Sequence, residues 1–132
     1  MNITVLGAGA FGTAIAKALS MNKENNVMLF SKNQSKVDEI NTLNTNISCF
    51  PTKYLPKSVY ATSNENDILN SDVVFIAYPS VHVIEKIEVV KNNFKEGVLL
   101  VNLSKGLLPG GITVVDAIKK KFQIDNIVTL KG

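Results

Sequence analysis

Apolar and polar positions follow two different periods along the chain, and the two periods alternate. Short apolar runs typical of buried strands fall at residues 2–6, 27–30, 58–62, 72–77, 97–103 and 127–130. Between them, apolar residues recur at helical spacing at 11–19, from about 33 to 43, and at 63–71, 80–93 and 112–122. The pattern therefore predicts strands that alternate with helices, and an irregular loop at 44–56 that carries Pro51 and Pro56.

This alternation predicts an α/β fold. Consecutive strand–helix–strand units build parallel sheets with right-handed crossovers, and strands that are apolar throughout are covered on both faces. We therefore expect a Rossmann-type doubly wound parallel sheet with the strand order 3-2-1-4-5-6. The 132 residues, 45% of them hydrophobic, suffice for one domain with its own core.

Composition and charge indicate the cellular location and the kind of ligand to expect. No apolar run approaches the roughly 18 residues of a membrane span. The chain opens in a strand pattern, so we expect no signal peptide. The single cysteine, Cys49, cannot form an internal disulfide, so we expect a reducing, cytoplasmic location. The net charge of +3 suits an anionic small molecule, and the scattered lysines do not form the basic stripe of a nucleic-acid-binding surface. The one lysine run, 119–121, is expected in the last turn of a helix.

One motif carries chemistry. Gly7, Gly9 and Gly12 form G-x-G-x-x-G directly after the first strand and at the start of the first helix. In that context the first glycine makes the tight turn, the second lets a pyrophosphate approach the backbone, and the third lets helix and strand pack closely. Free amides at the helix N-terminus then hold the phosphates. The motif predicts a dinucleotide-binding site, and a tight turn without a ligand is the alternative.

The end of the second strand bears on which dinucleotide binds. Domains that bind NAD place an acid there for the ribose 2′-hydroxyl, whereas this chain has Ser31 and Lys32. A hydroxyl and a cation suit a 2′-phosphate, so we expect NADP or NAD as the cofactor, with NADP favoured. The alternative is that Lys32 is a solvated loop lysine.

Ligands bind at the carboxyl ends of parallel strands, so the residues after the fourth and fifth strands are also candidates for the binding site. Pro79 follows the fourth strand and rigidifies a turn, and Lys105 follows the fifth strand beside a glycine. A cation at this edge suits a phosphate or a developing oxyanion. No metal-ligand spacing occurs, so we expect no bound metal; His82 is expected to be exposed and idle, and Cys49 to have no catalytic role.

Several stretches together resemble the bacterial-type NAD(P)-dependent sn-glycerol-3-phosphate dehydrogenases, over the whole length of the chain. The glycine motif is shared by many dehydrogenases, but tyrosine–leucine–proline and lysine–glycine elements at these distances are much more specific. The stretches are residues 7–14 (GAGAFGTA), Asn44 with the later Tyr54-Leu55-Pro56, Ser71-Asp72 before an apolar strand, Ala77-Tyr78-Pro79-Ser80 and Ser104-Lys105-Gly106-Leu107. The chain departs from the family where Tyr78 replaces a commoner valine and Ser104 a commoner threonine.

The resemblance implies a reaction and roles for individual residues. Members of the family interconvert dihydroxyacetone phosphate and glycerol 3-phosphate by hydride transfer, which feeds phospholipid synthesis. By this resemblance Ala10 and Phe11 contact the cofactor, and Lys32 lies beside its adenosine end. Lys105 touches both cofactor and substrate, and Gly132 lies near the substrate phosphate. The family's proton-transferring lysine belongs to a helical C-terminal domain, so we expect no catalytic residue in this chain.

We therefore predict that residues 1–132 are the dinucleotide-binding domain of a glycerol-3-phosphate dehydrogenase, and that a helical substrate domain would follow them. The expected partner is a phosphorylated small molecule, and the full-length form is expected to be a homodimer. Two alternatives stay open at this point. One is a fragment of another dehydrogenase, ketopantoate-reductase-like or 6-phosphogluconate-dehydrogenase-like, and the other is a nucleotide-binding module without catalysis.

Overall fold

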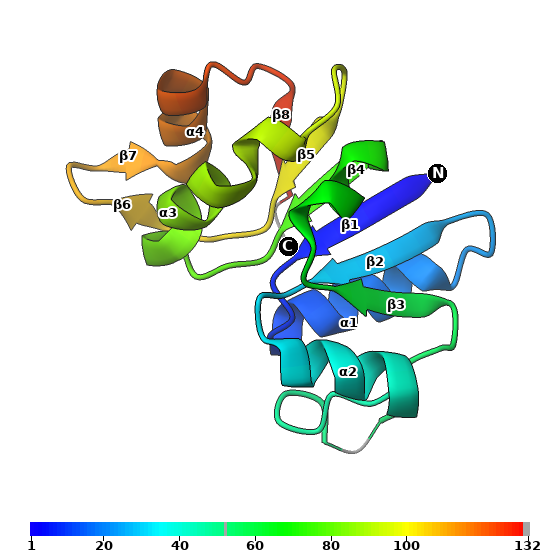
Figure 1. Cartoon of the computed structure of the whole chain (residues 1–132). Helices are drawn as coiled ribbons and strands as arrows, with labels where there is room; N and C mark the ends of the chain where they lie inside the picture. The colour runs from blue at the N-terminus through cyan, green and yellow to red at the C-terminus, as the bar shows by residue number, and fades with distance from the viewer. Residues whose placement is uncertain (52, 131–132) are drawn as a thin grey trace.

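The computed structural model describes residues 1–51 and 53–130, and a six-stranded parallel sheet forms its centre (Figure 1). The strands of this sheet are β1 (Asn2–Leu6), β2 (Asn26–Phe30), β3 (Val59–Thr62), β4 (Val73–Ile76), β5 (Leu99–Asn102) and β8 (Ile127–Thr129). The helices are α1 (Ala10–Ser20), α2 (Gln34–Leu43), α3 (Ser80–Val90) and α4 (Val114–Phe122), with the 3-10 helices η1 (Glu65–Asn70) and η2 (Lys91–Asn93). A two-stranded hairpin of β6 (Leu107–Leu108) and β7 (Ile112–Thr113) lies outside the sheet.

The strand order β3-β2-β1-β4-β5-β8 confirms the predicted doubly wound sheet, with β8 as the sixth predicted strand. β1 lies in the middle, where Leu6 pairs with Phe30 of β2 on one side and with Ile76 of β4 on the other. The chain builds one half of the sheet outward from β1 and then returns to build the other half. Ligands of such sheets bind at the carboxyl ends of the strands beside this reversal, which fixes where the site must lie.

Successive side chains of the central strands enter two separate cores, so the sheet is covered on both faces. In β1, Val5 packs in the core formed with α1 and α2, whereas Leu6 packs in the core formed with α3 and α4. In β2, Leu29 and Phe30 divide in the same way, and none of these four side chains is more than 2% exposed. This double burial is the reason why the central strands are apolar at most of their positions.

The hairpin before α4 differs from the sequence prediction. The helix predicted from residue 112 begins only after Thr113, because Ile112 and Thr113 form β7 and pair with β6. Gly110 and Gly111 make the turn between the two strands, with φ angles of 90° and 78°. The side chain of Thr113 then caps α4 by accepting a hydrogen bond of 3.1 Å from the amide of Asp116.

Two smaller details also differ. The short helix predicted at 63–71 begins only at Glu65, because the Asn64 side chain caps it by accepting a hydrogen bond of 3.0 Å from the amide of Asn66. Leu43, which the helical spacing placed on the buried face of α2, is 58% exposed. The helix ends at this residue, where Asn44 adopts a left-handed conformation with a φ of 56°.

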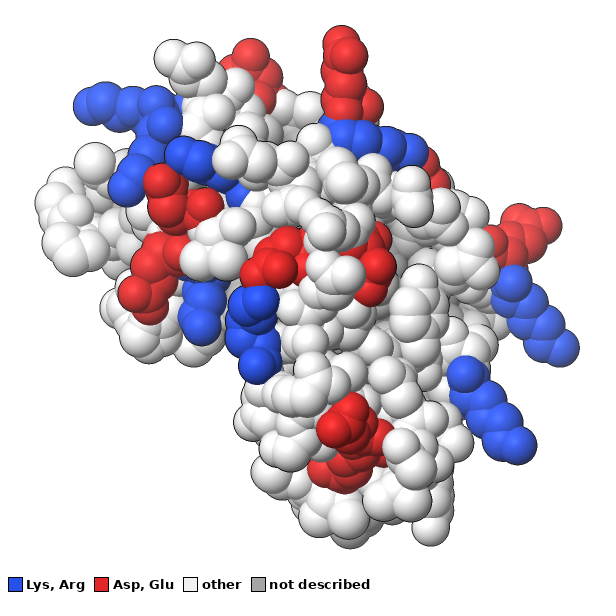
Figure 2. Space-filling model, in the orientation of Figure 1, with Lys and Arg blue, Asp and Glu red and all other residues white. Residues whose placement is uncertain are grey.

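Charged side chains of both signs are intermixed on the face drawn in Figure 2. The lysine run at 119–121 lies in the last turn of α4, as predicted, and His82 is exposed and contacts Glu85. Within residues 1–51 and 53–130, no helix combines the length and apolar character needed to cross a bilayer. The same residues contain no group of at least three His, Cys, Asp or Glu side chains placed to hold a metal ion.

Candidate functional site

Gly7 and Gly12 close the turn between β1 and α1. Gly7 has a φ of +104°, and a Cβ atom there would lie 2.9 Å from the carbonyl oxygen of Ala77. A Cβ atom on Gly12 would lie only 2.0 Å from the carbonyl oxygen of Gly7. Both positions therefore need glycine for the fold itself. Gly12 lines neither cavity described below, and what it provides is the close approach of α1 to β1.

Gly9 has no such reason within the protein to be glycine. Its φ of −78° and ψ of −170° are extended values that other residues adopt readily, and a Cβ atom there would meet no atom within 4 Å. The residue is exposed and lines both cavities beside the turn. A group bound directly against the backbone, such as a pyrophosphate, explains why a side chain is absent at this position.

The N-terminus of α1 begins at the same place. No side chain caps this helix, and its first turn contains no acidic residue. The first amides of a helix have no carbonyl partner within it, and they carry the positive end of the helix dipole. Ala10 and Phe11 of this first turn are both exposed. The arrangement fits an anionic group placed over Gly9.

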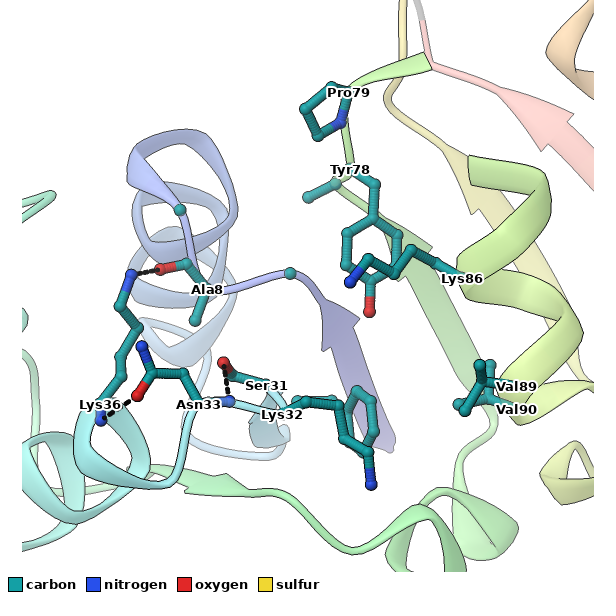
Figure 3. Close-up of a pocket in the computed structure, with 14 residues that line it drawn as sticks. Ala8, Ser31, Lys32, Asn33, Lys36, Tyr78, Pro79, Lys86, Val89 and Val90 are labelled. Atoms are coloured by element: carbon teal, nitrogen blue, oxygen red, sulfur yellow. Dashed lines mark hydrogen bonds between the residues drawn. The ribbon is translucent and has the colours of Figure 1, made fainter. Parts of the chain in front are cut away.

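A cavity of about 380 Å³ opens beside the glycine turn, at the carboxyl ends of β1, β2 and β4. Its cationic residues are Lys32 after β2, Lys36 on α2 and Lys86 on α3, and the described residues that line it include no carboxylate. Figure 3 shows Lys36 and Lys86 on opposite sides of this cavity, and the Lys86 Nζ atom lies 5.8 Å from the centre of the Tyr78 ring. The cavity therefore suits an anionic ligand.

The predicted residues Ser31 and Lys32 both line this cavity. The Ser31 Oγ atom accepts a hydrogen bond of 3.2 Å from the amide of Asn33, which turns the chain toward α2. The Lys32 Nζ atom donates to the carbonyl oxygen of Ser63 at 3.2 Å and forms an ion pair with Glu65. The hydrogen bond from Lys32 lowers the pKa of the Glu65 carboxyl below its ordinary value. The partners of Lys32 in this structure are protein groups, and its role toward a cofactor phosphate stays a prediction.

Two residues that the sequence analysis did not single out hold the glycine turn. The carbonyl oxygen of Ala8 accepts hydrogen bonds from Asn46 Nδ2 at 2.9 Å and from Lys36 Nζ at 3.1 Å. Asn46 is buried and donates also to Thr13 Oγ1 at 2.9 Å, while its own Oδ1 atom is buried without a hydrogen-bond partner among the described residues. The Lys36 Nζ atom also lies 3.4 Å from Cys49 Sγ. The sequence could have indicated Lys36, because this residue lies in the first turn of the helix that follows Ser31. No local pattern indicates Asn46.

A second cavity, of about 520 Å³, lies on the other side of the glycine turn. Ala10 and Phe11 line it from α1, and Lys105 lines it from the segment after β5. Gly9 and Pro79 line both cavities, so the two adjoin along the carboxyl edge of the sheet. The structure therefore brings the predicted residues from three strand ends together around one glycine turn.

Hydrogen bonds fix the segment after β5 against the end of β4. Ser104 Oγ donates to the main-chain carbonyl oxygen of Tyr78, and the Ser104 amide donates to Asn102 Oδ1 at 3.1 Å. Burial raises the pKa of Tyr78 to about 12. These bonds fix the backbone that carries Lys105, whose side chain is exposed. Gly132, expected near a substrate phosphate, lies outside the described residues.

Comparison with known proteins identifies the family. Residues 2–132 match the family described as NAD-dependent glycerol-3-phosphate dehydrogenase N-terminus. The chain belongs to this family. A glycerol-3-phosphate dehydrogenase (NAD(P)+) of Neorickettsia sennetsu is 32% identical over 133 residues, which cover 100% of this chain and 40% of that protein. The protein of the same name from Orientia tsutsugamushi is 34% identical over 127 residues, covering 96% of this chain and 38% of its own length.

The chain also shares its fold with solved structures. The glycerol-3-phosphate dehydrogenase of Coxiella burnetii superimposes with a TM-score of 0.84 at 24% identity, over 97% of this chain and 39% of that one. The enzyme of Saccharomyces cerevisiae gives a TM-score of 0.87 at 22% identity, over 100% of this chain and 42% of that one. The chain thus spans about two fifths of the length of the proteins it matches. The family match favours neither of the two alternatives left open by the sequence.

Membership in this family implies a nicotinamide dinucleotide as the cofactor. The features around Gly9 fit such a cofactor on physical grounds: an open approach to the backbone, an uncapped helix N-terminus and a cavity lined by lysines.

Proposed function

We propose that this domain binds NADP(H) or NAD(H) along the carboxyl edge of its sheet, with the pyrophosphate over Gly9. The main support is that neither the backbone nor the packing around Gly9 demands glycine, and that the two cavities extend from this residue in both directions. The adenosine half would lie in the cavity lined by Ser31 and Lys32, and the nicotinamide half in the cavity lined by Phe11 and Lys105.

We propose further that the whole protein interconverts dihydroxyacetone phosphate and glycerol 3-phosphate. The cofactor would supply or accept the hydride. The role of this domain would be to hold the nicotinamide ring where the carbonyl carbon of the substrate can approach to about 3–3.5 Å. Lys105 is exposed at the edge of the second cavity, where its charge fits the substrate phosphate or the negative charge that develops on the carbonyl oxygen. Pro79 and Phe11 line the same cavity and would limit the access of water to the reacting atoms.

The acid that protonates the product oxygen is, in this proposal, a lysine of a helical C-terminal domain. That domain would also supply most of the substrate pocket, with Gly132 beside the substrate phosphate. The length of the relatives supports this division, since residues 1–132 correspond to 40% of the Neorickettsia sennetsu protein. Within residues 1–132 we assign cofactor binding and a substrate contact, and no proton transfer.

The cofactor preference follows from the end of β2. Ser31 and Lys32 replace the acid that would accept a hydrogen bond from a ribose 2′-hydroxyl, and Lys36 adds a second cation to the same cavity. We therefore propose that NADPH binds at least as tightly as NADH. Calorimetric titration of the chain with both cofactors tests this, and a tenfold preference for NADH, about 1.4 kcal/mol, would contradict it.

A cytoplasmic location and a homodimeric full-length form stay predictions. The first follows from the single cysteine, and the second from the resemblance to the family. Cell fractionation and sedimentation of the full-length protein would check them.

A further inference from the structure

We propose that Glu65 sets the balance between NADPH and NADH, because it holds Lys32 away from the ribose 2′-phosphate. The proposal rests on the cofactor site proposed above and adds to it a residue on a different strand end. Glu65 would be a specificity-determining residue that acts through Lys32.

Lys32 and Glu65 meet because β2 and β3 are neighbours in the sheet. The amide of Ser31 donates a hydrogen bond of 3.0 Å to the carbonyl oxygen of Thr62, so the residues that follow the two strands lie side by side. Lys32 comes just after β2, and Glu65 is the first residue of η1 after β3. From there the Lys32 Nζ atom donates to the carbonyl oxygen of Ser63 at 3.2 Å and pairs with the Glu65 carboxylate.

The two partners differ in their relation to the cavity. Lys32 lines it and Glu65 does not. The Lys32 side chain is 53% exposed, so it has room to turn toward a ligand, whereas the Glu65 side chain is 30% exposed at the start of a capped helix. Glu65 carries its charge at neutral pH, and the hydrogen bond from Lys32 lowers the pKa of this carboxyl further below its ordinary value. The lysine is therefore the member of the pair able to exchange partners.

A 2′-phosphate and the Glu65 carboxylate would compete for one ammonium group. To bind the phosphate, Lys32 must give up or share its bond to Glu65, whose negative charge also repels the phosphate. A 2′-hydroxyl makes no such demand. The ion pair should therefore weaken the binding of NADPH and leave the binding of NADH nearly unchanged. Because exposed ion pairs contribute little, we expect an effect of a few-fold rather than of orders of magnitude.

Calorimetric titration of the Glu65→Gln variant with NADPH and with NADH tests the proposal. The Kd for NADPH should fall about two- to fivefold, and the Kd for NADH should stay within about twofold. Glu88→Gln is the control, since Glu88 of α3 forms an exposed ion pair of 3.0 Å with Lys91 of η2 and does not line the cavity. It removes the same charge and should change neither constant.

Lys32→Ala separates this inference from the cofactor proposal. If Lys32→Ala weakens NADPH binding while Glu65→Gln leaves the ratio of the two constants unchanged, the role of Glu65 is wrong and the cofactor site stands. If Lys32→Ala leaves NADPH binding unchanged, the phosphate role of Lys32 is wrong and the inference falls with it. If Glu65→Gln weakens NADH binding, the carboxylate serves the ribose hydroxyl, which overturns the proposal. Thermal unfolding of each variant within a few degrees of the original chain shows that the fold is retained.

Discussion

The side-chain amide of Asn46 donates a hydrogen bond of 2.9 Å to the carbonyl oxygen of Ala8, across 38 positions of sequence. A second bond of the same amide, to Thr13 Oγ1 at 2.9 Å, reaches the first helix beyond the turn. Asn46 thus fastens the loop after α2 to both ends of the glycine turn. The position of Gly9 therefore depends on a residue outside the motif.

We expect Asn46→Ala to lower the free energy of unfolding by about 1–2 kcal/mol. The Thr13 hydroxyl would lose a buried partner, whereas the Ala8 carbonyl would keep its bond to Lys36, so the cost stays moderate. NADPH binding should weaken several-fold because the glycine turn becomes less rigid. Urea denaturation and calorimetry measure the two effects, and the exposed Asn92→Ala serves as the control. Unchanged stability would show that Asn46 is dispensable to the turn.

Gly9→Val should abolish the binding of both cofactors and leave the fold intact. A Cβ atom at this position meets nothing within 4 Å, and valine adopts the extended backbone readily. As the residue caps α1, we expect a loss of no more than about 1 kcal/mol of stability and at least a 100-fold loss of affinity, about 2.7 kcal/mol. Tight cofactor binding by a folded Gly9→Val variant would place the pyrophosphate elsewhere.

Gly12→Ala should mainly reduce the stability of the fold, whereas Gly9→Val should mainly reduce the affinity for the cofactor. Its Cβ atom would lie 2.0 Å from the carbonyl oxygen of Gly7, so α1 must move away from β1. We expect a loss of about 2 kcal/mol or more in the free energy of unfolding. Ala14→Ser, at an exposed position of the same helix, should change it by less than about 0.5 kcal/mol. Equal stability of the two variants would refute the close packing described here.

Residues 1–132 should bind NADPH without reducing dihydroxyacetone phosphate. Loss of a positioned acid costs about 10²–10⁴-fold in rate, and loss of the substrate's orientation costs more. An assay that follows NADPH absorbance should show no turnover above background for this chain. A protein that also carries the helical domain should be active, and Lys105→Ala within it should lower the rate sharply. Turnover by residues 1–132 alone would contradict our assignment of roles.

The loop after α2 should loosen in acid because of Glu39. Its Oε2 atom accepts hydrogen bonds from the amide of Ile47 at 2.8 Å and from Thr45 Oγ1 at 2.7 Å, and these bonds lower the pKa of Glu39 from its ordinary 4.5. A lowered pKa in the folded state means that the stabilisation is complete above about pH 4.5 and is lost as the pH falls through the lowered value. Glu39→Gln should therefore reduce the slope of stability against pH below 4.5, and urea denaturation at a series of pH values measures it. The exposed Glu96→Gln should follow the original chain; a slope unchanged by Glu39→Gln would exclude this carboxyl as a cause.

The sheet and the glycine turn were predictable because their causes are local. Two-sided burial makes the strands largely apolar, and the positive φ of Gly7 and the contact of Gly12 with Gly7 arise within one strand–helix turn. The predicted residues Ser31 and Lys105 follow strand ends, and a parallel sheet brings such ends to one edge. The hairpin at 107–113 could also have been predicted, since Pro109, Gly110 and Gly111 are a turn signal between Leu107-Leu108 and Ile112-Thr113.

The rest of the site depends on contacts that no local pattern records. Asn46 lies in an irregular loop, and only the folded chain brings it to Ala8. The ion pair of Lys32 joins two strand ends 33 positions apart, where neither residue signals the other. Lys86 lines the first cavity from α3, and the sequence pattern of this helix does not distinguish Lys86 from an ordinary solvent-exposed lysine.

The central place of β1 has a consequence for how the chain folds. β1, β2 and β3 follow one another in the sequence and can pair as soon as the two crossovers between them have formed. The second half of the sheet attaches only when Ile3 of β1 pairs with Val73 of β4, 70 positions later in the sequence. Parallel pairings over such separations are entropically costly to start, which slows folding relative to helical domains of equal size. We expect β1 to belong to the folding nucleus and β8, which pairs only with β5 among the described strands, to dock last. During synthesis β1, β2 and β3 would therefore form a partial sheet, in which one edge of β1 stays unpaired until β4 has emerged from the ribosome.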